Sequence, residues 1–189
     1  MFGIAVPSAK SKAAASVERR LYTKLMEQHY ASVYNYLCWM ARDETLAADL
    51  TAETFARLWR YLPSPREGSS LRAYVFRAAL NEYRRHRGRH GEAPAPIEEA
   101  EDLPADSADE PPVALDRREL RRCVRAAVER LPETHRAVIL LHGLEGFTLR
   151  EVAEVLGVPI GTAKSRLGAA FEVLRRSLHE WRGDSGDVR

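Results

Sequence analysis

The segment 92–116 constrains the architecture most, because it cannot contribute to a packed core. It holds nine Asp and Glu residues, no Arg or Lys, five of the chain's ten prolines and no aromatic residue. Such a composition buries too little apolar surface to offset the entropy of ordering. We therefore expect a flexible acidic linker over 92–115 that divides the chain into two domains. The alternative, a structured acidic loop within one domain, is disfavoured because long structureless loops are uncommon in compact domains.

The formal net charge of +2 hides a strong segregation of charge along the chain. Residues 17–91 carry 13 basic and 8 acidic side chains, and residues 117–182 carry the same numbers. Because 25 of the 29 basic residues are Arg in an Ala-rich chain, compositional bias explains the total and only clusters are informative. The expected organisation is a disordered N-terminal tail over 1–16, domains over 17–91 and 116–182, and a C-terminal tail over 183–189.

Composition also limits the cellular compartment in which such a chain is expected to function. No apolar run approaches the roughly 20 residues of a membrane span, and the first residues lack the basic region of a signal peptide. Cys38 and Cys123 are too few for a disulfide scaffold and form no CxxC motif. We expect a cytoplasmic protein without direct membrane insertion.

Both blocks have helical periodicity, and neither shows the sustained alternation typical of strands. The first block predicts helices over about 17–41, 47–62 and 71–87, the third capped by Ser70. The second block predicts one helix over about 116–130 and another from Pro132 to near Gly143. The fold class is therefore all-α, with two small helical domains.

A short helix and a longer one end the second block. Thr148 and Glu151 have the spacing of a capping box, and Gly157 stands where a left-handed residue ends a helix. Pro159 then opens the last helix. A short helix, a glycine-containing turn and a second helix form a helix-turn-helix pattern, typical of major-groove DNA binding.

The last helix has an apolar and a polar face. The residues expected to be buried are Ile160, Ala163, Leu167, Ala170, Phe171, Leu174 and Leu178. Those expected to face outward near the N-terminus, as donors to bases and phosphates, are Gly161, Thr162, Lys164, Ser165 and Arg166. The alternative is an ordinary helical hairpin with a solvated basic face.

Two helices of the first block also carry binding chemistry. Over 43–59, Asp49, Glu53 and Arg57 follow one another at i, i+4, and they suit either a basic partner helix or pairing within the helix. Over 71–90, arginines interleave with Tyr74, Phe76 and Tyr83. Arginines track phosphates and aromatic rings stack on unpaired bases, although Tyr74 and Phe76 also suit the core.

The sequence Leu131–Leu167, which includes the helix-turn-helix, resembles region four of bacterial sigma factors, and more narrowly that of the extracytoplasmic-function class. Residues 43–59 and 71–90 resemble the core-binding and promoter-opening helices of region two. The resemblance implies a subunit that binds core RNA polymerase and promoter DNA, and an anti-sigma factor is expected as a further partner. Region two would also cradle a flipped minus-ten base in the loop 62–70.

The resemblance assigns roles to individual residues. Those implied for binding core polymerase are Asp49, Leu50, Glu53, Thr54, Arg57 and Leu58. Those implied for the minus-ten element are Arg72, Tyr74, Arg77, Asn81, Arg84, Arg85 and Arg87. Those implied for the minus-thirty-five element are Arg150, Gly161, Thr162, Lys164, Ser165 and Arg166.

Other functions fit the sequence less well. The six histidines show no HExxH spacing and no glycine-rich phosphate loop is present, so we expect no enzyme, no cofactor and no small-molecule substrate. A zinc site built from Cys123, His135 and His142 is disfavoured, and no metal is expected. The alternatives are a free-standing helix-turn-helix regulator and a helical adaptor that binds only protein. The regulator would lack the helix over 43–59 and the Arg-aromatic helix. The adaptor would not need Lys164, Ser165 and Arg166 at the groove-facing end.

Overall fold

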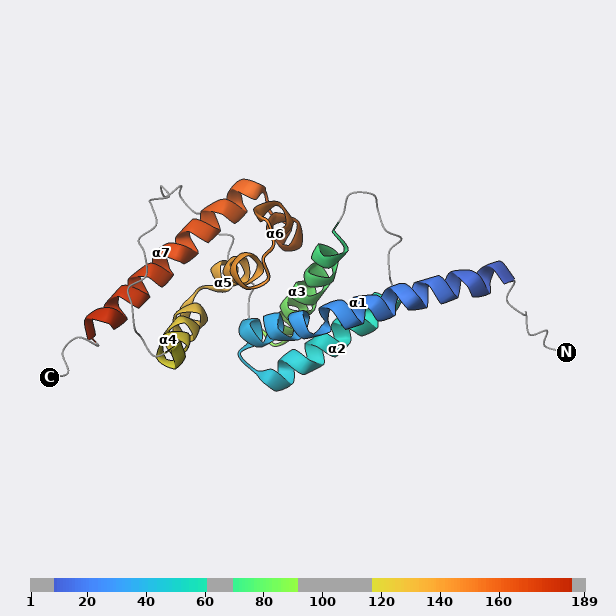
Figure 1. Ribbon diagram of the computed structural model, residues 1–189, viewed down its shortest axis with the longest axis horizontal. Helices are drawn as coiled ribbons and strands as arrows, with labels where there is room; N and C mark the ends of the chain where they lie inside the picture. Colours follow the sequence, from blue (N-terminus) through green and yellow to red (C-terminus); the bar gives the residue numbers. More distant parts are fainter. Residues whose placement is uncertain (1–8, 61–69, 92–116, 185–189) are drawn as a thin grey trace.

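The computed structural model describes residues 9–60, 70–91 and 117–184, and every regular element in these ranges is helical (Figure 1). This confirms the all-α class. The elements are α1 (Ala9–Ala41), α2 (Glu44–Arg60), α3 (Leu71–Arg89), α4 (Arg117–Arg130), α5 (Glu133–Ile139), the π-helical turn η1 (Leu140–Leu144), α6 (Leu149–Leu156) and α7 (Ile160–Asp184).

The first three helices pack together into the first domain. Asp43 begins α2, because its carboxylate accepts the Leu46 backbone N–H at 3.0 Å. Ser70 begins α3 as predicted, with its hydroxyl accepting the Ala73 N–H at 3.3 Å. Such side-chain caps satisfy backbone donors that a helix leaves unpaired at its start. The core between the helices includes Tyr36 and Phe55, each at most 1% exposed.

The first helix starts earlier than the sequence predicts. Residues 9–16 were expected in a disordered tail, but they form the first turns of α1. The reason is local, because Ala and Lys dominate this stretch and both have high helix propensity. At the other end of the chain, α7 extends to Asp184, two residues past the predicted boundary.

The second domain consists of α4 to α7, with α4, α5 and α6 each packed against α7. The predicted helix after Pro132 ends in η1, where the Phe147 N–H donates to the Leu141 carbonyl at 3.0 Å. Gly146 follows with φ of 69°, a conformation that glycine adopts without steric cost. This turn places Glu145 and Phe147 immediately before α6.

The local signals for α6 are confirmed. The Thr148 hydroxyl accepts the Glu151 N–H, and the Glu151 carboxylate accepts the Thr148 N–H at 3.0 Å, which completes the capping box. Gly157 ends the helix with φ of 70°. Pro159 lies just before α7, with its carbonyl accepting the Ala163 N–H at 3.1 Å.

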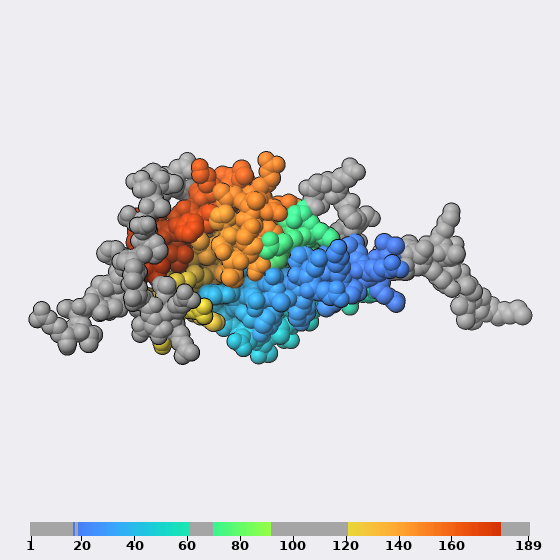
Figure 2. All heavy atoms as spheres, in the orientation of Figure 1, coloured from blue at the N-terminus to red at the C-terminus, as the bar shows by residue number. Residues whose placement is uncertain are grey.

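The two domains lie directly against each other. Helix α3 of the first domain packs on α6 of the second, and the two domains touch without a gap in the space-filling view (Figures 1 and 2). Buried residues of both domains form one apolar cluster. The sequence predicted two domains on a tether and gave no indication of this contact. The predicted linker 92–115, Asp116 and most of the loop 62–70 lie outside the described residues. Among the described helices, none is both long and apolar enough to cross a bilayer.

Candidate nucleic-acid and partner interfaces

Helix α2 presents its charged residues outward and its apolar residues inward. Asp49, Glu53 and Arg57 are exposed, as a partner-binding face requires. The other three residues predicted to bind polymerase lie in the core: Leu50, Thr54 and Leu58 are at most 1% exposed. The Thr54 hydroxyl donates to the Leu50 carbonyl at 2.7 Å, which satisfies it within the helix. These three residues pack beneath the exposed charged face of α2 and are not part of that face.

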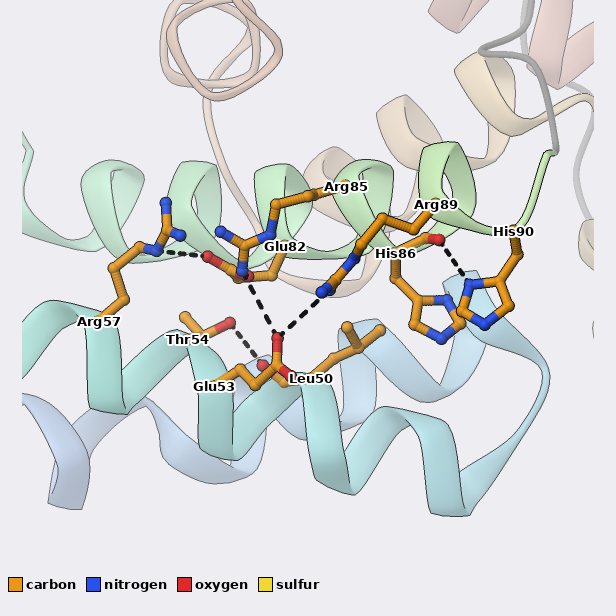
Figure 3. A network of polar contacts seen from close by, with 9 residues as sticks. All are labelled: Leu50, Glu53, Thr54, Arg57, Glu82, Arg85, His86, Arg89 and His90. Carbon is orange, nitrogen blue, oxygen red and sulfur yellow. Dashed lines mark hydrogen bonds and ion pairs between the residues drawn. The ribbon is translucent and has the colours of Figure 1, made fainter.

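A network of ion pairs joins α2 to α3 (Figure 3). Its centre is Glu82, whose side chain is 1% exposed and whose Oε1 lies 2.7 Å from the Nε of Arg57. Arg85 also pairs with Glu82 across one turn of α3. Glu53 of α2 lies 3.5 Å from Arg85 and 3.9 Å from Arg89, both measured between its Oε2 and Nη2.

This network alters the interpretation of the α2 charges. The ion pairs of Glu53 and Arg57 run to α3 instead of along α2. The face predicted for a protein partner and the helix predicted for DNA therefore share charged contacts. Sequence reasoning missed Glu82, although an acid three residues before Arg85 within an arginine run was a usable signal.

The residues predicted for the minus-ten element spread around α3. Arg77 and Asn81 are exposed, whereas Arg72, Tyr74, Arg84, Arg85 and Arg87 are partly buried. Phe76 and Tyr83 are at most 5% exposed, so the proposed stacking role of these two rings is wrong for this arrangement. Phe76 instead meets the rings of Tyr36 and Phe147 edge-on, with centroids 5.6 Å and 5.0 Å away. Its phenyl ring suits the core because it has no polar atom to satisfy.

The N-terminal part of α7 mostly follows the prediction. Gly161 and Lys164 are exposed, Thr162 and Ser165 are half-buried, and Arg150 at the start of α6 is exposed. Gly161, Thr162, Lys164 and Ser165 lie in the first turns of α7, the second helix of the helix-turn-helix. The unpaired backbone N–H groups of a helix start favour anions there.

Arg166 does not face outward as predicted. It is only 4% exposed. Burial, and then the neighbouring guanidinium of Arg84, lower the pKa of Arg166 below its ordinary value. A residue predicted for one DNA element therefore lies near a residue predicted for the other. No local pattern in the sequence could reveal this burial.

The apolar face of α7 is narrower than predicted. Ala163, Leu167 and Ala170 are buried, and Leu174 and Leu178 are partly buried, as expected. Ile160 and Phe171 are 54% and 52% exposed. Both stand at one edge of the apolar stripe, and the helices that cover α7 do not reach that edge.

Comparison with known proteins identifies the two domains. Residues 25–92 match the family model of sigma-70 region 2, and residues 121–174 match that of sigma-70, region 4. The ECF RNA polymerase sigma factor SigL of Mycobacterium tuberculosis is 29% identical over 91% of this chain and 97% of the relative. The ECF RNA polymerase sigma-E factor of Salmonella typhimurium is 30% identical over 67% of this chain and 70% of the relative.

Solved structures give the same result. The sigma factor RpoE of Bartonella quintana, crystallised with the anti-sigma factor NepR, is 25% identical with a TM-score of 0.63, covering 84% of this chain and 96% of that one. CnrH, solved with the cytosolic domain of CnrY, is also 25% identical with a TM-score of 0.63, covering 89% of this chain and 94% of that one.

A region-2 domain followed by a region-4 helix-turn-helix defines a transcription initiation factor rather than an enzyme. The chain belongs to the sigma-70 family, in its extracytoplasmic-function class. This family membership supports the sigma-factor interpretation over a free-standing regulator.

Proposed function

We propose that this sigma factor binds core RNA polymerase through the charged face of α2 and directs it to a promoter through α3 and the start of α7. The observation that carries the proposal is the exposure of Asp49, Glu53 and Arg57 on one face of α2. An acidic helical face can pair with basic residues of a partner helix. Leu50, Thr54 and Leu58 hold that face in place from the core.

The DNA contacts divide between the two domains. Exposed Arg77 and Asn81, with the partly buried Arg84 and Arg85 after them on α3, would contact the minus-ten element. Lys164, with Thr162 and Ser165, would read the minus-thirty-five element at the start of α7, and Arg150 would contact phosphate. Arg72 and Arg87 pair with acids of the second domain, so they would join only if the domains separate. Tyr74 is partly buried and Arg166 is buried, and they would join under the same condition.

An anti-sigma factor is a further proposed partner. The similar solved structure of RpoE is a complex of a sigma factor with the anti-sigma factor NepR. We also propose that the chain acts in transcription initiation in the cytoplasm.

Charge reversal on α2 tests the polymerase contact. Asp49→Arg should reduce co-elution with core RNA polymerase, since it places a cation on the acidic face without breaking a contact in the core. Glu27→Arg is the matched control, because Glu27 is an exposed acid of α1 and the change in net charge is the same. Equal co-elution of the two variants would contradict the α2 assignment. Run-off transcription with core polymerase, with and without the protein, tests whether the protein directs polymerase to a promoter.

A further inference from the structure

The exposed side of α7 contains a glycine that the packing of the chain does not require. Gly168 lies inside the helix, where glycine has the lowest helix propensity of any residue except proline. Within the described part of the chain, and apart from its own helical turns, no atom lies within 4 Å of the place that a Cβ atom would take. The φ of Gly168 is not positive, so any residue can adopt its backbone conformation. Alanine would therefore fit at this position and would favour the helix.

Two side chains flank Gly168 on the same side of α7. Residues three or four positions apart are neighbours on a helix, so Lys164 lies one turn before Gly168 and Phe171 lies about one turn after it. All three positions are exposed, whereas Ala163 and Ala170 on the other side of the helix are completely buried. We call Lys164, Gly168 and Phe171 the open face of α7.

The exposure of Phe171 is the second unfavourable feature of the open face. Its phenyl ring has no polar atom for water to solvate, and 52% of the residue is exposed. A single exposed apolar side chain is common and indicates nothing by itself. Here the ring lies one turn from a glycine that leaves the helix backbone bare. An apolar group and an uncovered backbone on one face together indicate a partner that approaches α7 closely.

The dimensions of the open face suit the major groove of DNA. Seven positions separate Lys164 from Phe171, which is about 10.5 Å along α7 at 1.5 Å per residue. The groove is about 12 Å wide, so a helix that lies in it can bring both side chains to base pairs of one site. The Lys164 cation is attracted by the phosphates, and a residue without a side chain lets the backbone approach the base edges. Among the groups that bases present in this groove, the methyl group of thymine is the apolar one that a phenyl ring can contact.

We propose that Gly168 and Phe171 set the sequence preference of the helix-turn-helix. Gly168 admits the DNA close to α7, and the Phe171 ring contacts a thymine methyl group in the minus-thirty-five element. The inference rests on the proposed function, because it takes α7 as the helix that reads this element. The contact selects a T·A base pair, because thymine is the only one of the four bases with a methyl group in the major groove. Phe171 thus adds a base-selective contact to the donor that Lys164 supplies.

Glycine-to-alanine substitution tests the close approach. Gly168→Ala in the full-length chain should raise the melting temperature by about 2–4 °C, because alanine favours the helix. The holoenzyme of this variant with core RNA polymerase should nevertheless bind its duplex about fivefold more weakly, because the added methyl group holds α7 away from the base edges. Gly143→Ala is the matched control, since Gly143 lies in η1 with equally open space around it, and it should leave the DNA affinity unchanged. A purely structural role of Gly168 would not combine a more stable chain with weaker DNA binding.

Removal of a thymine methyl group tests the Phe171 contact. The probe is a fluorescein-labelled duplex enriched by the wild-type holoenzyme from a pool with a random central segment, and fluorescence anisotropy measures its binding. Each thymine is then replaced in turn by deoxyuridine, which lacks only the methyl group. One replacement should weaken wild-type binding about fourfold, the value for one buried apolar carbon. Phe171→Ala should bind the thymine duplex more weakly and lose nothing further on that deoxyuridine duplex. Leu144→Ala, at an exposed apolar residue outside α7, is the control and should respond as the wild type does.

Each outcome decides the proposal. Equal responses of the wild type and Phe171→Ala to every deoxyuridine replacement would overturn the methyl contact, and an unchanged DNA affinity of Gly168→Ala would overturn the close approach. Loss of co-elution with core polymerase in Phe171→Ala would assign the ring to a protein contact instead. A wild-type holoenzyme that enriches no duplex would contradict the proposed function and this inference together, whereas enrichment with unaltered variants would contradict the inference alone.

Discussion

The Nε of Arg57 lies 2.7 Å from the Oε1 of Glu82, and this ion pair joins α2, the helix proposed to bind polymerase, to α3, the helix proposed to bind DNA. Glu82 is almost completely buried and pairs also with Arg85. A buried carboxylate is expensive to desolvate unless cations and hydrogen bonds compensate it. Glu82 therefore depends on both arginines, and both arginines are oriented by it.

Glu82→Gln should lower the free energy of unfolding by about 1–3 kcal/mol, the range for a charged hydrogen bond lost in a buried setting. Arg57 is half exposed and can be rehydrated, which keeps the loss below that of a fully buried pair. Glu53→Gln is the control, since this exposed acid should cost less than about 1 kcal/mol. Urea denaturation measures both, and equal midpoints for the two variants would refute the central role of Glu82.

Arg136 is the second buried charge on which the fold depends. Its guanidinium donates to the carbonyls of Val128, Glu129 and Leu131 at the end of α4, at 3.3, 3.1 and 2.7 Å, besides Met40. Arg136→Met should destabilise the chain by about 2–4 kcal/mol, because it leaves several carbonyls without donors. Thermal unfolding followed by circular dichroism measures the loss. Arg130→Met, at an exposed position nearby, is the control and should be close to neutral.

The capping box of α6 predicts a pH dependence. Hydrogen bonds from the Thr148 backbone and hydroxyl lower the pKa of Glu151 below its ordinary value of 4.5. The unfolded chain then binds this proton more readily than the folded one, so the contribution is present at neutral pH and is lost as the pH falls through the lowered pKa.

Comparison with Glu151→Gln isolates this contribution from other acids. The wild type should be more stable than the variant by about 0.5–1 kcal/mol at neutral pH, the range of a capping interaction. The difference should shrink as the pH falls through the lowered pKa of Glu151, because the carboxylate protonates there. Urea denaturation at a series of pH values measures it. A difference that stays constant across this range would show that the Glu151 charge does not stabilise α6.

Lys164 should matter for the minus-thirty-five element more than a cation farther along the same helix. Lys164→Ala should reduce promoter-dependent run-off transcription roughly fivefold or more, the loss expected for one base or phosphate contact of about 1 kcal/mol. Arg175→Ala is the control, because Arg175 is exposed on α7 and pairs with Glu172. Equal loss in both variants would show a general charge effect, and co-elution with polymerase should not change in either.

Local signals in the sequence were sufficient for most helix boundaries. Ser70, the Thr148–Glu151 capping box and Gly157 each act within one turn of chain, so the residues that form the signal also form the structure. The apolar spacing of α2 likewise identified its buried side. Apolar spacing did not show how much of α7 the other helices cover. Ile160 and Phe171 were therefore predicted to be buried, but they are exposed.

The sequence by itself determined the helical class, the helix-turn-helix and the charged face of α2, because these follow from periodicity and from contacts between residues a few positions apart. Only the tertiary structure decided that Glu82 centres the α2–α3 network, that Arg166 is buried and that Arg72 meets Glu145 and Phe147. Those pairings bring together residues from different helices or different domains. Their energies depend on how whole surfaces fit, and no periodicity along the chain encodes that fit.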